Sequence, residues 1–166
     1  MKKTGYAALV LVIMTAGLLS PSNAEAADDE IRLTFLGTGA PRPSERRYGP
    51  SILVEAGDYK ILVDAGPGMR ERLFQAGGFE LFTAVDHMLI THLHFDHTIS
   101  APGLWLTGWL FGRKEPMKVF GPVGTSAMME HFQAAYQWDI SYRTTVGVHE
   151  EGSRIIAKDI EPGVFF

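Results

Sequence analysis

Residues 91–97 read Thr91-His92-Leu93-His94-Phe95-Asp96-His97 and directly follow an apolar, strand-like run, Val85–Ile90. His92 and His94 are two positions apart, and because side chains alternate between faces in extended chain, both imidazoles are expected on one side. Leu93 and Phe95 are then expected to point the other way, into a core. Imidazole and carboxylate groups at this density indicate a metal site.

The chain must turn after Phe95, so the adjacent Asp96 and His97 are expected to diverge from the first histidine pair and to be able to hold a second metal nearby. Two metal ions about 3.5–4 Å apart suit hydrolysis. The alternative is a set of ordinary polar residues at a strand end. Three of the six histidines of the chain fall within residues 92–97, and this concentration favours the metal site.

These residues resemble the metallo-β-lactamase superfamily, whose signature is His-x-His-x-Asp-His at the end of a strand. Three further segments occur around the motif in the order typical of the ribonuclease Z branch, which also contains phosphodiesterases and arylsulfatases: Phe35–Gly39, Ile61–Gly66 and Phe120–Gly124. The resemblance implies an α/β (α+β) fold. We expect the N-terminal part of a metallo-β-lactamase αββα sandwich, with a mixed sheet flanked by helices.

The resemblance also implies roles for the motif residues. His92 and His94 would bind a first metal and Asp96 and His97 a second, with Asp96 also the catalytic residue that orients the attacking hydroxide or passes on its proton. Two zinc ions are expected in the complete domain, with manganese or iron as alternatives. Asp64 matches an aspartate that supports the metal loop by hydrogen bonding, a plain turn aspartate being the alternative.

The family site is completed by a third histidine, a bridging aspartate and a final histidine from downstream segments, and no residue of this chain matches them. We expect His131 on a helix surface, His149 in a solvated loop and His87 in a structural position. Each metal would therefore receive two ligands, fewer than the three protein ligands usual for catalytic zinc.

Arg46 and Arg47, with Arg42 nearby, are candidate substrate-binding residues because guanidinium groups pair well with phosphate or sulfate oxygens. A solvated loop is the alternative. The preceding Gly37-Thr38-Gly39 lacks the pattern of a phosphate-binding loop, so we expect it to leave backbone room beside the metal cleft. Trp105 and Trp109 are four positions apart and are expected to pack in the core rather than to form a substrate platform.

The first 26 residues have the pattern of a signal peptide. A basic start precedes the apolar run Ala7–Leu19, which is too short for a stable membrane span, and Ala24-Glu25-Ala26 supplies a small-x-small cleavage pattern. We expect a periplasmic or secreted mature chain without a stable membrane anchor. An uncleaved anchor is the alternative.

Residues 27–166 are enough for one domain. The 166-residue chain has a net charge of −4, and loss of the leader with Lys2, Lys3 and Glu25 makes it −5. This acidic balance disfavours nucleic acid as a partner. The chain has no cysteine, which excludes disulfides and thiolate ligands within it.

Apolar periodicity and turn residues predict a mixed sheet covered by helices. The expected strands are 31–36, 51–55, 59–63, 85–90 and 117–120, and the expected helices are 69–76, part of 99–111, and 125–136. The chain ends on Val164-Phe165-Phe166, which has the composition of a strand just starting. We therefore expect a truncated chain, with a natural end as the alternative.

The expected function is that of a metal-dependent hydrolase that cleaves a small phosphodiester or related anionic ester through metal-bound hydroxide. A β-lactamase or lactonase of the same fold is one alternative. A second is an incomplete half-domain that binds metal weakly and is inactive, and the 166-residue chain alone is expected to be inactive in either case. A homodimer is compatible with the sequence.

Overall fold

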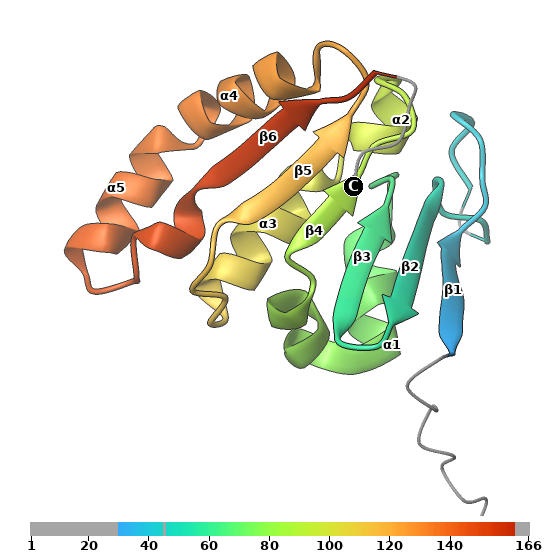
Figure 1. Cartoon of the computed structure of the whole chain (residues 1–166), viewed down its shortest axis with the longest axis horizontal. Coiled ribbons are helices and arrows are strands. Elements are labelled where there is room, and N and C mark those ends of the chain that lie inside the picture. The colour runs from blue at the N-terminus through green and yellow to red at the C-terminus, as the bar shows by residue number, and fades with distance from the viewer. Residues whose placement is uncertain (1–29, 45, 162–166) are drawn as a thin grey trace, which may run out of the picture.

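Six strands form one mixed sheet in chain order, β1 to β6 (Figure 1). The computed structural model describes residues 30–44 and 46–161, so the expected leader and the final apolar triplet lie outside the described residues. The strands are β1 (Ile31–Gly37), β2 (Ser51–Ala56), β3 (Tyr59–Val63), β4 (His87–Leu89), β5 (Met117–Gly121) and β6 (Ile155–Asp159). The helices are α1 (Met69–Ala84), α2 (Phe95–Thr98), α3 (Ala101–Leu110), α4 (Thr125–Ala135), α5 (Gln137–Thr145) and the 3₁₀ turn η1 (Glu151–Ser153).

The sheet changes character at β3. Strands β1, β2 and β3 are antiparallel neighbours, and β3 to β6 are parallel neighbours joined by helical crossovers. Gly57, with φ +53, makes the tight reversal between β2 and β3. In this arrangement the carboxyl ends of β3, β4 and β5 meet at one edge, which is where ligands bind in open α/β sheets.

Most of the expected elements are present, but two differ in extent and two others were not expected. Helix α1 is interrupted at Gly77-Gly78 as expected, but helical structure resumes beyond the kink and continues to Ala84. The motif strand β4 covers only three residues of the expected six. Helix α5 and strand β6 were not expected. Among the described residues, no helix is long and apolar enough to cross a membrane.

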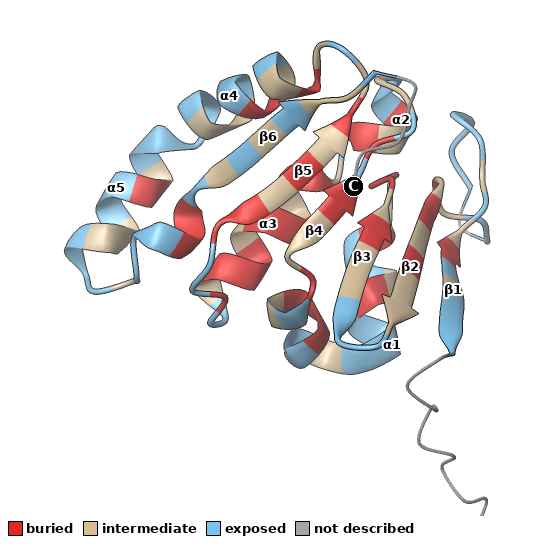
Figure 2. Cartoon of the chain, viewed as in Figure 1, coloured by how far each residue is buried: buried red, intermediate tan, exposed pale blue. Residues whose placement is uncertain are grey.

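The core lies between the sheet and helices α1 and α3, which pass behind the strands in Figure 1 and carry buried residues, coloured red in Figure 2. Trp105 and Trp109 are 1% and 2% exposed, which confirms core packing. Their indole N–H groups donate to the backbone oxygens of Ser153 (2.9 Å) and His149. Both buried indole N–H groups thus have a hydrogen-bond acceptor in the segment 149–153, which ends with η1.

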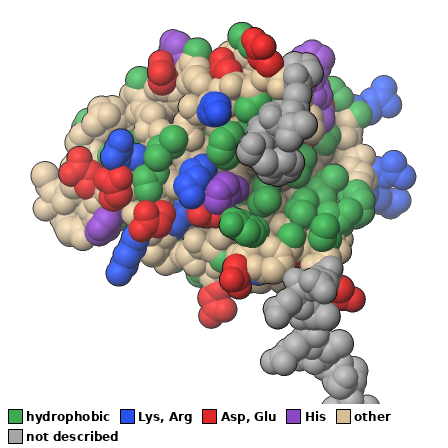
Figure 3. All heavy atoms as spheres, in the orientation of Figure 1, with side chains coloured by type: hydrophobic (Ala, Val, Ile, Leu, Met, Phe, Trp, Pro, Cys, Tyr) green, Lys and Arg blue, Asp and Glu red, His purple; other side chains and the backbone are tan. Residues whose placement is uncertain are grey.

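The opposite face of the sheet carries apolar side chains that remain exposed in the described part of the chain. On β1, Ile31 and Leu33 are 70% and 53% exposed. The space-filling view shows hydrophobic side chains gathered over the β1 side of this face (Figure 3). The described residues therefore form one sheet with its helical layer.

Arg113 is a buried residue that the sequence did not single out. Its Nη2 donates to the carbonyl oxygen of Trp105 (2.7 Å), and its side chain packs against Gly108. Burial lowers the pKa of Arg113 to about 10, and the nearby Asp86 carboxylate partly offsets this. The guanidinium joins the end of α3 to the segment that leads into β4.

Asp159, at the end of β6, clamps the turn between β5 and α4. Its carboxylate accepts hydrogen bonds from the backbone N–H groups of Gly124 (2.9 Å) and Ser126 (2.7 Å). These hydrogen bonds hold the pKa of Asp159 below its usual range. The interaction joins the edge strand to the first turn of α4.

This clamp predicts a pH effect on stability. Because the pKa of Asp159 is lower in the folded than in the unfolded state, its contribution is complete above the unfolded value of about 4 and is lost as pH falls through the folded value. We expect Asp159→Asn to lower the melting temperature at pH 7 and to lessen the decrease in melting temperature between pH 5 and pH 2. Thermal denaturation at both pH values measures this, and a parallel shift of the two proteins across that range would contradict it.

Candidate metal centre

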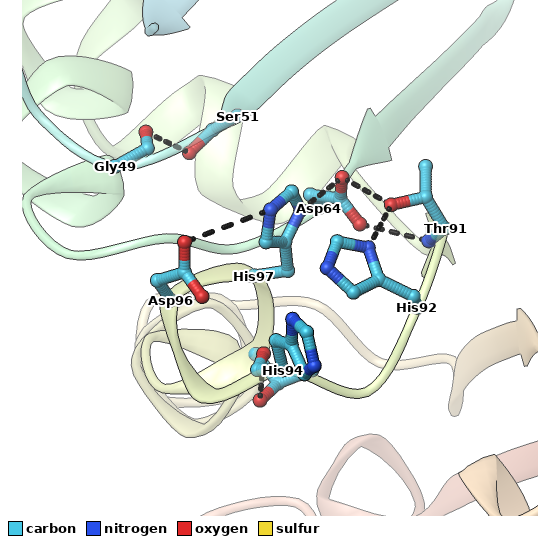
Figure 4. A network of polar contacts seen from close by, with 9 residues as sticks. Gly49, Ser51, Asp64, Thr91, His92, His94, Asp96 and His97 are labelled. Atoms are coloured by element: carbon cyan, nitrogen blue, oxygen red, sulfur yellow. Dashed lines mark hydrogen bonds and ion pairs between the residues drawn. The ribbon is translucent and has the colours of Figure 1, made fainter. Parts of the chain in front are cut away.

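The histidine motif lies at the carboxyl edge of the parallel strands. After β4, the Ile90 N–H donates to Phe120 O (2.8 Å), which holds the chain against β5 before it leaves the sheet. Residues 91–94 are irregular, and the one-turn helix α2 begins at Phe95. Figure 4 shows the motif side chains facing one another across this loop.

His92 and His94 lie on the same side of the loop, as expected from their spacing. Their ring centroids are 4.7 Å apart. Leu93 packs against the core as expected, but Phe95 is 59% exposed, so its expected burial is wrong. The reason is that α2 starts at Phe95, where side chains no longer alternate between faces, and Asp96 (4% exposed) takes the buried position instead.

His97 does not diverge from the first pair. The turn of α2 brings its ring to a centroid distance of 3.9 Å from that of His92. Its Nδ1 lies 2.7 Å from Oδ2 of Asp64. Because an ionised carboxylate only accepts hydrogen bonds, this contact places the proton on Nδ1 and leaves the Nε2 lone pair available to a ligand.

Asp64 also organises the start of the loop. Oδ1 accepts the Thr91 N–H and Oδ2 accepts the Thr91 hydroxyl, both at 2.8 Å. Since that hydroxyl donates to Asp64, it accepts from Nδ1 of His92 (3.1 Å), which leaves Nε2 of His92 free as well. One carboxylate therefore orients two imidazoles, His97 directly and His92 through Thr91.

The backbone of Asp64 is as constrained as its side chain. Its φ is +59, the only positive value at a described residue other than glycine, and aspartate is among the residues that tolerate this conformation. Its N–H donates to Leu89 O (2.8 Å), and the next N–H, that of Ala65, donates to His97 O (2.7 Å). The end of β3 is thereby joined to both β4 and α2.

The donor set fits a metal ion by its chemistry. Asp96 is nearly buried, and Nε2 of His97 lies 3.7 Å from its carboxylate, which is too long for a hydrogen bond. A buried carboxylate in such surroundings is stabilised by a cation. Within residues 30–44 and 46–161, however, no three His, Asp or Glu side chains are already arranged as a complete metal site.

Gly66 is a site-forming residue that the sequence reasoning missed. A Cβ at this position would lie 2.6 Å from Asp96 O, 2.5 Å from Gly49 C and 2.7 Å from Pro50 N. Its N–H donates to Pro50 O (3.0 Å). The absence of a side chain lets α2 and the segment before β2 approach from opposite sides, and the signal in the sequence was the glycine two residues after the strand-end aspartate Asp64.

Gly37 and Gly39 give the backbone room that was expected of them. A Cβ at Gly37 would lie 2.8 Å from Tyr48 O, and the Gly39 N–H donates to the same oxygen (2.6 Å). These glycines give this room to the segment around Tyr48, and a Cβ at Gly49 in that segment would in turn meet Gly66.

The remaining candidates lie apart from the motif. His131 is exposed on α4 with its ring nitrogen on Ala127 O (2.6 Å), His149 is exposed, and His87 pairs with Asp86 (2.6 Å) at the start of β4. Their expected roles on a helix surface, in a loop and in a structural position are confirmed. Arg46 and Arg47 are exposed in the loop before β2, not among the motif side chains.

A mixed sheet backed by helices, with a histidine loop at the carboxyl edge of its parallel strands, is the N-terminal architecture of the metallo-β-lactamase fold, and the chain is a member of that superfamily in its ribonuclease Z-like branch. More than half of the chain, residues 31–122, matches the model of the family described as Anti-Pycsar protein Apyc1, and the chain belongs to that family.

Similar proteins support this assignment. Ribonuclease Z from Mycobacterium sp. (strain KMS) is 41% identical over 115 residues, which cover 68% of this chain and 40% of that protein. Human tRNase Z, short form, superposes with a TM-score of 0.55 at 29% identity, over 76% of this chain and 44% of that structure. The metallo-β-lactamase-fold protein YhfI from Bacillus subtilis gives 0.56 at 20% identity, over 81% and 48%, and shows the shared fold. The chain spans about 40% of the length of the mycobacterial ribonuclease Z proteins that it matches.

Proposed function

We propose that the complete protein that carries this chain is a metal-dependent hydrolase that cleaves a phosphodiester or a related small anionic ester. The observation that carries the proposal is the grouping of His92 and His97 around Asp64, which leaves Nε2 of both rings free at the carboxyl edge of the sheet. The similarity to ribonuclease Z, an enzyme named for nucleic-acid hydrolysis, supports a phosphodiester over a β-lactam or lactone.

In this proposal His92 and His94 hold one ion, and Asp96 and His97 hold a second. Zinc is the expected metal, with manganese or iron as alternatives. A bound metal supplies Lewis-acid activation of water and of the scissile ester. The residues of the chain do the rest: Asp64 fixes the ring orientations, and the Asp96 carboxylate orients the attacking water or accepts its proton.

The proposal is tested on the purified full-length protein. We expect it to contain zinc or manganese and to hydrolyse a bis-aryl phosphodiester or an aryl sulfate, and we expect His92→Ala to lose both properties. His131→Ala, at an exposed histidine on α4, is the matched control and should keep both. A full-length protein that binds neither metal, or that hydrolyses neither ester, would refute the proposal.

Residues 27–166 alone supply two donors to each proposed ion, fewer than catalytic zinc usually requires. We therefore propose that this part binds metal weakly and has no measurable turnover. Export of the mature chain, inferred from residues 1–26, is part of the same proposal and favours a small substrate over nucleic acid.

A further inference from the structure

A basic pocket lies outside the histidine loop, between the end of β1, the segment before β2 and helix α1. Its volume is about 390 Å³. Three of its lining side chains are Arg46, Arg47 and Arg72, and none of its lining residues within 30–44 and 46–161 is an aspartate or glutamate. We call these three residues with Tyr48 and Gln75 the arginine pocket. Such a concentration of positive charge in an acidic chain attracts an anion.

One of the three arginines is positioned by neighbouring side chains. The Arg72 guanidinium lies 5.0 Å from the ring centroid of Tyr48, and its Nη1 donates to Gln75 Oε1 (3.2 Å). The backbone N–H groups of Arg46 and Arg47 both donate to the Ser44 hydroxyl, at 3.3 and 3.1 Å. These backbone hydrogen bonds hold the segment that carries the two adjacent arginines, whose side chains are exposed.

These guanidinium groups are not neutralised by the carboxylates of the described residues. The ion pairs found among residues 30–44 and 46–161 involve Arg143 and Arg154 but none of the three pocket arginines. Guanidinium forks pair bidentately with the oxygens of phosphoryl groups. The pocket is therefore suited to a phosphoryl group.

One wall of the pocket is apolar. Phe35 lines it and is 62% exposed, whereas the Tyr48 ring is already engaged by Arg72 on one side and lies against Gly68. An exposed aromatic side chain beside cationic groups accommodates a planar or apolar part of a ligand next to its anionic part. A small organic phosphate fits these surroundings better than inorganic phosphate does.

A single chain segment separates the arginine pocket from the histidine loop. Tyr48 lines the pocket, and two residues later Pro50 O accepts the Gly66 N–H (3.0 Å). The Cα of Gly66 in turn lies against the carbonyl of Asp96. A ligand at the pocket therefore lies beside the chain segment that also packs against the histidine loop.

We propose that the arginine pocket binds a phosphoryl group of a small organic phosphate, distinct from the ester group that is cleaved. A role of the arginine pocket as a substrate subsite rests on the proposed function, whereas binding of the phosphoryl group to the pocket does not. Arg72 and the adjacent Arg46 and Arg47 supply the hydrogen bonds to the phosphoryl oxygens, and Phe35 contacts the organic part.

Binding is measured by calorimetry on the full-length protein with the His92→Ala substitution, so that phosphate cannot bind through the metal loop. The probes are a nucleoside 5′-monophosphate, a sugar phosphate, inorganic phosphate and the unphosphorylated nucleoside. We expect Arg72→Ala to weaken monophosphate binding about tenfold, the loss typical of one charge-assisted hydrogen bond. Arg46→Ala, in an exposed loop, provides a second variant that leaves the fold intact.

The control is Arg154→Ala, which removes the same charge from an exposed residue directly after η1. It should leave the affinity for the monophosphate unchanged. The proposal would be overturned if Arg154→Ala weakened monophosphate binding as much as Arg72→Ala does. It would also be overturned if Arg72→Ala left the affinity for the monophosphate unchanged. If the sugar phosphate binds as tightly as the nucleotide, the phosphoryl group alone accounts for recognition. If the unphosphorylated nucleoside binds as tightly as the nucleotide, the proposal of a phosphoryl site is contradicted.

Kinetics separate this proposal from the proposed function. With the wild-type metal loop, Arg72→Ala should raise KM about tenfold for a diester that carries an additional phosphate and leave KM for a bis-aryl phosphodiester unchanged. Absence of hydrolysis of both substrates refutes the proposed function and leaves the calorimetric test of the pocket standing. An equal rise in KM for both substrates refutes the separate subsite.

Discussion

Asp64→Asn is expected to weaken metal binding by the full-length protein about 10- to 100-fold, the usual effect of losing a carboxylate that orients metal-bound histidines. The carboxylate accepts from Nδ1 of His97 and from both donors of Thr91. An asparagine amide that keeps the hydrogen bond from the Thr91 N–H through its oxygen turns its NH₂ group toward the Thr91 hydroxyl and His97. The His97 ring then accepts at Nδ1 and carries its proton on Nε2, where it blocks the metal.

The fold should survive this substitution, because asparagine tolerates the positive φ of residue 64 and has nearly the same shape as aspartate. The matched control is Asp86→Asn, which alters an aspartate–histidine pair of similar geometry with His87 (2.6 Å) at the other end of the sheet. Metal titration monitored by calorimetry, with far-UV circular dichroism as the folding check, gives the result. Unchanged metal affinity in Asp64→Asn, or an equal loss in Asp86→Asn, would show that Asp64 does not position the ligands.

The sequence predicted this part of the molecule well because the signals are local. The β2–β3 hairpin depends on two β-rich runs around Gly57, and the His92–His94 pair depends on a spacing of two residues. Both can be read within a few residues of chain. The fold class followed from the same segments together with the resemblance, and it is confirmed by the structures that share the metallo-β-lactamase fold.

The elements that the sequence did not predict depend on distant contacts. Helix α5 buries only Ile140 and therefore lacks the apolar stripe that identifies a helix. Strand β6 is defined by its parallel pairing with β5 and by the Asp159 clamp on α4, both formed with residues more than 30 positions earlier. Neither partner is visible in the residues of β6 themselves.

The position of Phe95 shows the same limit on a smaller scale. Alternation predicted a buried side chain, and the one-turn helix α2 reversed the prediction within one residue. What sets the start of α2 is the contact of its backbone with the end of β3, where Ala65 N–H donates to His97 O and Ser100 N–H donates to Ala65 O (2.9 Å). The metal loop is thus shaped by a strand about 30 residues away.

Gly66→Ala is expected to disturb both stability and metal binding, because the new Cβ meets backbone atoms on two sides. Its distances to Gly49 C, Pro50 N and Asp96 O, 2.5–2.7 Å, are shorter than real Cβ contacts, and no flexible side chain is available to move. Separation of α2 from the segment before β2 would displace Asp96 and His97. Overpacking of this kind costs about 1–3 kcal/mol of folding free energy, which lowers the melting temperature by several degrees.

The control for Gly66→Ala is Gly103→Ala on α3. A Cβ there would meet only Arg70, at an ordinary 3.4 Å from its Cδ, and an added methyl group favours helix. We expect Gly103→Ala to leave metal content unchanged and to leave stability unchanged or slightly higher. We expect Gly66→Ala to bind metal at least about tenfold more weakly, because a misplaced pair of ligands loses more than about one kcal/mol of binding free energy. Chemical denaturation and metal titration of the two variants measure these effects. If Gly66→Ala matched Gly103→Ala in both assays, α2 would not be held in place by close packing at Gly66, and the Asp64 hydrogen bonds alone would have to position Asp96 and His97.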